Sequence, residues 1–487
     1  MTNVFVERAR RAVYPNQCPY SPDEPYPEYA LGDVAPEPNE VYRAVRRCLR
    51  SAASRLGLSP DNPLKRWIRP GQTVILKPNM VKERHPRDPN GWTYVLTHGS
   101  VIRAVADYVF LALEGQGKVI VADAPQTDSS FDKAKRLLGL DELADFYRSR
   151  GLSFESRDLR KQQWDARDGV VFRRRELRGD PEGYVACDLG DRSEFVGHGG
   201  EGRYYGADYD TVEVNKHHSG GRHEYLLSAT SLNADVFFNL PKLKTHKLAG
   251  ITCSLKNLVG INGDKNWLPH HTQGTPQNGG DAYPVESLRS RTEHSAISVL
   301  RRLALKVPAA GPAALWTLKK LAVPLLGETD KVSRGGNWYG NDTAWRMCLD
   351  LNKILLYGNA DGTLRADRRE SRKTYLSLCD GIVGGQGGGP ANPDPVESSL
   401  IVFGDDPAAV DAACAVLMGL DPERIPTVRQ AFLCKHFPIT DVCWRDVRCC
   451  SSEPEWNRTL DNMDPGNVPR FEPHFGWRGH IERDREK

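Results

Sequence analysis

Residues 234–271, ADVFFNLPKLKTHKLAGITCSLKNLVGINGDKNWLPHH, are the most informative stretch of this 487-residue chain. The stretch opens with an apolar run, 236–240, that predicts a buried strand. Lysines, histidines, glycines and other small residues follow directly. A hydrophobic core does not need that mixture, whereas a functional site does, because lysine and histidine supply charge, proton transfer, metal ligation or a covalent attachment point. The sequence therefore predicts a sheet strand that ends at a site.

Alternating strand and helix patterns around this stretch predict an α/β fold with mostly parallel sheets and flanking helices. The clearest predicted strands are 73–77 and 118–122, with a helix at 101–114 between them. We expect a β-rich insertion and a helical insertion in addition. The expected division is an N-terminal extension at 1–65, a first core part at 66–274 with the β-rich insertion at 152–230, the helical insertion at 275–340, a second core part at 341–450 and a tail at 451–487.

Several local patterns give sharper expectations. Within the β-rich insertion we predict a strand at 211–214 and a helix at 224–232. In the second core part we predict a strand at 375–379 followed by a glycine loop. Asp406 and Pro407 are suited to cap and begin a helix at 408–418.

The composition bounds the possible functions. Hydrophobic residues make up 39% and charged residues 26%, as in soluble globular proteins. The net charge of +3 gives no strong attraction for nucleic acid. No signal peptide and no apolar run of about 18 residues is recognisable, so no transmembrane segment is expected. The 11 cysteines are odd in number and scattered, so without a recognisable signal peptide we expect reduced thiols in a cytoplasmic protein. They include no CxxC pair.

Polar groups follow four predicted strands directly, at the strand ends where ligands bind in open α/β sheets. We therefore expect one shared site for a small-molecule substrate. The catalytic candidates are Lys77, His246, Lys256 and Asp380. The substrate-binding candidates are Asn79, Asp123, Lys242, Lys244, Gly385, Gly387 and Gly388.

Two features leave alternatives open. The glycines around Gln386 either form a nest of backbone N–H groups for an anion or make a tight structural crossover. His270 and His271 offer a metal ligand, although one histidine of an adjacent pair usually faces away, so we expect only one of them to bind a metal.

Eight segments in chain order resemble the family catalogued as domain of unknown function 362. They are VILKPNMV (74–81), THGSVIRAV (97–105), VADAP (121–125), ADVFFNLPKLKTH (234–246), GITCSLKNLVG (250–260), GNDTAWR (340–346), DGIVGGQGGGP (380–390) and DDPAAVDAACAVLMG (405–419). Many members carry a fused ferredoxin with two iron–sulfur clusters. This chain lacks such a cysteine array, so no intrinsic iron–sulfur cluster is expected.

The block HKLAGITCSLKNLVG (246–260) is also similar to the site of lactate racemase-type enzymes. That resemblance implies a nickel-pincer nucleotide attached to Lys256, with His246 as the pocket histidine and His271 as the nickel ligand. The chain departs from that family at Lys77-Pro78-Asn79 and at Ser254-Leu255, so a shared scaffold does not imply a shared cofactor.

Three functions fit these observations. The leading hypothesis is an enzyme that acts on a small carboxylate or phosphate metabolite, with or without a divalent metal; isomerase, hydrolase and transferase are not distinguished. The second is a redox or iron–sulfur-associated partner protein. The third is a non-catalytic scaffold that binds a partner protein through residues 290–326.

Overall fold

The computed structural model describes residues 2–484 except residues 30, 168–169, 209, 286–332, 334, 465 and 467. The predicted partner surface at 290–326, and most of the predicted helical insertion at 275–340, lie outside the described residues.

An 11-stranded, mostly parallel sheet with flanking helices forms the centre of an α/β fold, and three small two-stranded sheets lie beside it. The fold class predicted from the sequence is confirmed. The main path of the large sheet runs β17-β1-β16-β14-β10-β2-β3-β4, with β11, β12 and β15 attached to it. The strands of this sheet are β1 (Asn3–Arg8), β2 (Thr73–Pro78), β3 (Lys118–Asp123), β4 (Ser153–Asp158), β10 (Val236–Leu240), β11 (Lys242–His246), β12 (Gly250–Thr252), β14 (Thr374–Gly388), β15 (Asn392–Val396), β16 (Leu400–Gly404) and β17 (Arg448–Ser451).

The small sheets are antiparallel and come mostly from the region predicted to be β-rich. They pair β5 (Gln162–Arg167) with β6 (Val170–Glu176), β7 (Tyr184–Asp188) with β9 (Glu224–Ser228), and β8 (Tyr204–Gly206) with β13 (Pro269–Thr272).

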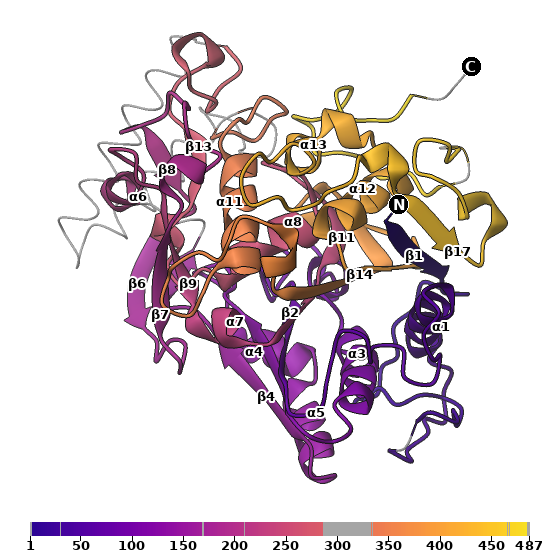
Figure 1. Ribbon diagram of the computed structural model, residues 1–487. Coiled ribbons are helices and arrows are strands. Elements are labelled where there is room, and N and C mark those ends of the chain that lie inside the picture. The colour runs from indigo at the N-terminus through magenta and orange to yellow at the C-terminus, as the bar shows by residue number, and fades with distance from the viewer. Residues whose placement is uncertain are drawn as a thin grey trace.

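Helices cover both faces of the large sheet. Figure 1 shows α1 and α3 on one side and α11 and α12 on the other. The helices are α1 (Glu40–Arg55), α2 (Trp92–Val95), α3 (Gly99–Ala112), α4 (Phe131–Leu137), α5 (Leu140–Arg148), α6 (Thr211–His217), α7 (Ala229–Asn233), α8 (Ser254–Asn257), α11 (Ala344–Tyr357), α12 (Pro407–Leu417) and α13 (Pro426–Ala431).

Strand β10 explains why the sheet is buried on both faces. It pairs in parallel with β2 on one side and with β14 on the other. All five of its residues are buried, and successive phenylalanines enter opposite core clusters, Phe238 on the α3 side and Phe237 on the α11 side. A parallel strand covered on both faces reads as a continuous apolar run, which is the pattern seen in the sequence.

Both ends of the chain contribute to the core. β1, from the predicted N-terminal extension, lies in the large sheet between β16 and β17. In the C-terminal tail, Trp456 and Trp477 are buried, and Trp477 Nε1 donates to the carbonyl of Lys247 over 2.8 Å. The extension and the tail are therefore packed parts of the fold.

Three local predictions differ from the structure. Residues 211–214 belong to helix α6, because Asp210 caps it by accepting from the N–H groups of Val212 and Glu213. Residues 224–232 form strand β9 and then α7, because β9 pairs with β7. β14 continues through the glycines to Gly388 because β15 pairs with them. The cap by Asp406 is confirmed, since its carboxylate accepts from Ala409 N.

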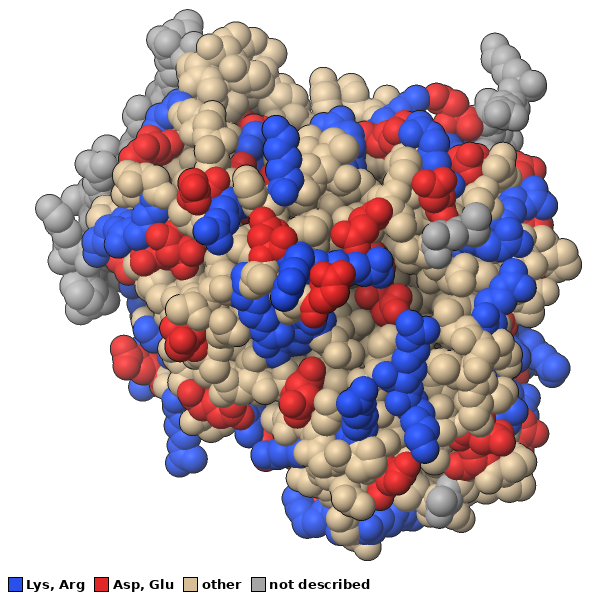
Figure 2. All heavy atoms as spheres, in the orientation of Figure 1, with Lys and Arg blue, Asp and Glu red and all other residues tan. Residues whose placement is uncertain are grey.

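None of the helices in the described parts of the chain combines the length and the apolarity needed to cross a membrane. On the face drawn in Figure 2, basic and acidic side chains are interspersed rather than separated into patches of one sign. That distribution fits the small net charge.

A buried carboxylate fixes the short helix α8, which carries Lys256. Asp411 on α12 accepts hydrogen bonds from the backbone N–H groups of Ser254, over 2.6 Å, and Leu255, over 3.1 Å. Asp411 is 1% exposed, so water does not replace it. A helix of four residues leaves its first N–H groups without acceptors inside the helix, and the carboxylate of Asp411 supplies two acceptor oxygens.

We expect Asp411→Ala to lower the free energy of unfolding by about 2 kcal/mol or more, because two buried N–H groups lose their acceptor. Urea unfolding measures this. Asp405→Ala, which removes an exposed carboxylate nearby, should change stability by about 0.5 kcal/mol or less. Equal effects of the two substitutions would contradict the role given to Asp411.

Candidate functional site

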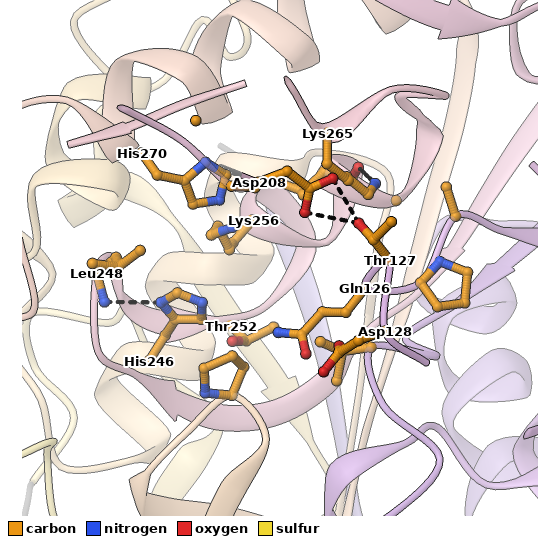
Figure 3. A pocket seen from close by; sticks show the side chains of 18 of the residues that line it. Gln126, Thr127, Asp128, Asp208, His246, Leu248, Thr252, Lys256, Lys265 and His270 are labelled. Carbon is orange, nitrogen blue, oxygen red and sulfur yellow. Dashed lines mark hydrogen bonds between the residues drawn. The ribbon is translucent and has the colours of Figure 1, made fainter. Parts of the chain in front are cut away.

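A cavity of about 420 Å³ opens at the carboxyl ends of β2 and β3 and beside α8. Figure 3 shows that two groups of side chains face each other across it. His246, Thr252, Lys256 and His270 form one group, and Gln126, Thr127, Asp128, Asp208 and Lys265 form the other. The first group comes from the stretch that the sequence singled out.

A buried ion pair closes the base of the cavity. Lys77 Nζ lies 2.7 Å from Asp123 Oδ1, and both side chains are 3% exposed or less. Burial lowers the pKa of Lys77, and the Asp123 charge opposes that effect. Gly260 passes so close that an added Cβ would lie 1.9 Å from Asp123 Oδ1, so any side chain there would displace the pair.

Amide side chains tie this pair to the neighbouring strands. Asn257 Oδ1 accepts from Lys77 Nζ over 3.1 Å and from Asn79 Nδ2 over 2.8 Å. Asn257 Nδ2 donates to Asn239 Oδ1 over 2.7 Å, and Lys244 Nζ donates to Asn79 Oδ1 over 2.9 Å. These groups therefore hold the base of the cavity, and much of their hydrogen-bonding capacity is used within the protein.

The two histidines of the first group are held in opposite tautomers. His246 Nδ1 lies 3.0 Å from the backbone nitrogen of Leu248, which can only donate, so His246 Nδ1 is the acceptor and Nε2 carries the proton. His270 Nδ1 lies 2.9 Å from the carbonyl of Leu268, which can only accept, so Nδ1 carries the proton and Nε2 has the lone pair. One ring thus offers a donor and the other an acceptor.

Burial keeps both rings neutral. Burial first, and then the charge of Lys256, hold the pKa of His246 and the pKa of His270 well below the usual value. His271, the nickel ligand implied by the resemblance, also lines the cavity and stacks on Tyr205 with ring centroids 4.9 Å apart.

Lys256 differs from the other buried lysines. Its side chain lines the cavity, its exposure is 7%, and no described residue forms a hydrogen bond or ion pair with its Nζ atom. Burial lowers its pKa. Thr252 Oγ1 is also buried at the cavity wall and has no hydrogen-bond partner among the described residues. Unsatisfied buried polar groups cost stability, which marks this wall as a place for a ligand.

The opposite wall was not predicted as part of the site. Thr127 Oγ1 donates to Asp208 Oδ2 over 2.8 Å, and burial raises the pKa of Asp208 to about 6. Lys265 Nζ donates to the carbonyls of Val259 and Asn262, and burial lowers its pKa to about 7. Lys265 stood in the stretch singled out above, whereas no sequence pattern marks Asp208.

The structure separates the predicted site residues into two places. Those that line the cavity are Lys77, Asn79, Asp123, His246, Lys256, His270 and His271. Lys244 lies behind this wall, is 0% exposed, and holds Asn79.

The remaining candidates do not line the cavity. Lys242 and Asp380 form a fully buried pair 3.0 Å apart, and the hydroxyl of Tyr14 donates to the same carboxylate over 2.6 Å. Gly385, Gly387 and Gly388 belong to β14 and pair with β15. The glycine segment, predicted to be a loop, is therefore part of a paired strand.

Three cysteines far apart in the sequence meet in the core. Cys253, Cys379 and Cys414 are buried, and their sulfur atoms lie within 4.8 Å of one another. Three thiol ligands could hold a metal ion, and thiolates suit soft ions. No sequence pattern predicts this cluster, because its members come from the start of α8, from β14 and from α12, which meet only in the fold.

Comparison with known proteins adds a family match. Residues 198–416 match the family model described as Domain of unknown function (DUF362). The matched segment includes His246, Lys256 and His270, whereas Lys77, Asp123 and Thr127 lie N-terminal to it. The cavity is therefore completed by residues outside the matched segment.

No curated protein matches the chain. Among solved structures, a crystal structure of a Thermotoga maritima protein from a structural genomics consortium is similar, with 11% sequence identity and a TM-score of 0.33. The match covers 77% of this chain and 58% of that chain, which is less than two thirds of its length.

We expect Lys256→Met to stabilise the fold by about 0.5–2 kcal/mol at neutral pH, in the range of other substitutions that remove functional strain. Lys256 has a pKa below 10.5 in the folded state, so the unfolded chain binds its proton more readily. The free energy of unfolding of the wild type should therefore rise with pH relative to that of the variant. The difference in unfolding free energy between the two proteins should narrow as the pH approaches 10.5.

Urea unfolding of both proteins at several pH values measures this gap. The exposed Lys435→Met is the matched control and should show no such pH-dependent difference. A Lys256→Met variant that is less stable than the wild type at neutral pH would show that the amine stabilises the protein without a ligand.

Proposed function

We propose that this protein is an enzyme that binds a small anionic metabolite, a carboxylate or a phosphate, in the cavity beside α8. The observation that carries the proposal is the buried Lys256 at the cavity wall, whose Nζ atom has no hydrogen-bond or ion-pair partner among the described residues. A buried amine without a partner is costly, and an anion that enters the cavity supplies the missing charge and acceptor atoms.

The groups beside Lys256 complete a recognition site for such an anion. Thr252 Oγ1 has an unused hydrogen-bond donor, and the tautomer of His246 places a second donor at Nε2. Together with Lys256 they offer three donors to the oxygen atoms of one carboxylate or phosphate. His270 Nε2 is the acceptor in the same group, which suits a general base.

The opposite wall indicates the other end of the ligand. Asp208, Asp128 and Gln126 present oxygen atoms there. These groups suit hydroxyl or amino groups of the metabolite. The substrate we propose is therefore anionic at the end near Lys256 and carries hydrogen-bond donors at the far end.

A second candidate is the nickel-pincer enzyme implied by the resemblance to lactate racemase-type proteins. Lys256 would be the attachment amine and His271 the nickel ligand, and both line the cavity. Such a group would supply hydride chemistry when bound. On the protein side, Lys256 would orient the group and His246 would donate a proton. The buried cluster of Cys253, Cys379 and Cys414 is a separate place for a metal.

The remaining hypotheses stay proposals with less support. A redox or iron–sulfur-associated role would have to place its metal at the three-cysteine cluster or on a partner protein. A scaffold role depends on residues 290–326, which lie outside the described residues.

We expect carboxylated and phosphorylated metabolites to raise the melting temperature of the wild type. The best ligand should lose at least about tenfold in affinity with Lys256→Met, because a charge-assisted hydrogen bond is lost. Lys435→Met is the control and should bind as the wild type does. Calorimetry in buffers of different ionisation enthalpy should also show proton uptake as the pH rises through the lowered pKa of Lys256, because the anion restores its charge.

The pH dependence has a definite sign. The affinity for the anion should be highest below the pKa of Lys256 in the free protein, where the amine is charged. It should fall as the pH rises through that value. Binding that is unchanged in Lys256→Met, or no binding of any anion, would contradict the proposal. Stoichiometric nickel together with an added mass on Lys256, in protein from its native host, would favour the second candidate.

A further inference from the structure

We propose that Lys256 Nζ is an amine nucleophile that forms an imine with an anionic metabolite carrying an aldehyde or ketone group. This inference rests on the proposed function and narrows its substrate class. Imine-forming lysines are neutral at the moment of attack, and proteins obtain that state by removing the lysine from water and from anionic partners.

The other buried lysines show what Lys256 lacks. Lys77 and Lys242 contact carboxylates, at 2.7 Å and 3.0 Å. Lys353 contacts Glu194 at 2.6 Å, and Lys373 donates to the carbonyl of Leu232. Lys244 and Lys265 donate to carbonyl oxygens as well. In each case the partner holds the amine in place or stabilises its charge. No described residue forms a hydrogen bond or an ion pair with the Lys256 amine, and only the buried Cys348 acts to raise its pKa.

The second observation is the pair of imidazoles near this amine. In Figure 3, Lys256 lies between His246 and His270. Burial first, and then the charge of Lys256, lower the pKa of both rings. Their tautomers are fixed by backbone groups, so His270 Nε2 can take a proton and His246 Nε2 can donate a hydrogen bond. An amine, a base and a donor at one wall are the groups that imine formation needs.

The reaction balances with these groups. His270 Nε2 takes a proton from the Lys256 ammonium, and the Nζ lone pair then attacks the carbonyl carbon. The carbonyl oxygen gains negative charge, which the protonated His270 stabilises through a hydrogen bond from Nε2–H. A proton moves from nitrogen to this oxygen, giving a carbinolamine. His270 returns its proton to the hydroxyl, water leaves, and a protonated imine remains.

Because Lys256 lies at the same wall as the donors of His246 and Thr252, the site suits anions that also carry a carbonyl group. In a 2-oxo acid the carboxylate is directly bonded to the carbonyl carbon. When Lys256 attacks that carbon, the carboxylate lies beside it, within reach of the donors of His246 and Thr252. An anion without a carbonyl meets the same wall and forms only the ion pair with Lys256.

Trapping with borohydride tests the inference. The full-length protein is incubated with pyruvate, glyoxylate or pyridoxal 5′-phosphate, and borohydride is added to reduce any imine to a stable amine. Intact mass and peptide mapping then locate the adduct. Isobutyrate, which has the size of pyruvate without its ketone, is the control ligand. We expect a single adduct on the peptide that contains Lys256.

Two variants separate the nucleophile from the cation. Lys256→Arg keeps a positive charge but cannot become neutral, so it should retain anion binding and lose the adduct by about tenfold or more. Lys256→Met should lose both. Lys435→Met, at an exposed lysine, should react as the wild type does, and circular dichroism confirms that each variant is folded.

The outcomes separate this inference from the proposed function. An adduct on Lys256 with at least one probe, absent in Lys256→Arg, supports it. No adduct with any probe, in a protein that still binds isobutyrate or phosphate through Lys256, overturns the imine and leaves the proposed function intact. An adduct that maps to Lys265 also overturns it, as does a Lys256 already carrying another group in protein from its native host. Failure of both binding and trapping overturns both proposals.

Discussion

The contact between Lys77 and Asp123 is the constraint on which the site depends. Two opposite charges lie 2.7 Å apart at the ends of the neighbouring strands β2 and β3, in surroundings that exclude water. Such a pair is tolerated only when its remaining donors and acceptors are also satisfied. Lys77 Nζ also donates to Asn257 Oδ1 and to the carbonyl of Pro78, and Asp123 Oδ2 accepts from the backbone N–H of Met80. Gly260 leaves room for the pair because it has no side chain. The turn through α8 is therefore held against the sheet, and this fixes the position of Lys256, which lies on α8.

Lys256 and Thr252 stand out against this background. The other buried lysines are satisfied, so Lys256 is the exception among the buried lysines of the described residues. Proteins often keep a functional site at a cost in stability, because groups arranged for a ligand are not arranged for one another. The fixed tautomers of His246 and His270 add to this view, since each ring is held by the backbone and presents its second nitrogen for other use.

The sequence predicted much of the fold and part of the site. Apolar runs identified β2, β3 and β10, because strands buried on both faces have little choice of residue. It failed at β9 and α6, where pairing with β7 and the cap by Asp210 outweighed local preference. It grouped Asp380 with the site because a polar residue follows a strand there. That carboxylate instead pairs with Lys242 and Tyr14, and whether a strand-end group faces a cavity or a neighbour depends on what packs beside it.

By itself the sequence determined the α/β class, the strand at 236–240 and the concentration of lysine and histidine after it, because periodicity and composition are local properties of the chain. The tertiary structure alone decided which of those groups have partners. It placed Asp208, from the β-rich region, at the cavity wall, and it placed Cys253 beside Cys379 and Cys414. It left Lys256 without a counter-ion among the described residues. Partnership between side chains is a matter of distance in space, and neither spacing nor composition encodes it directly.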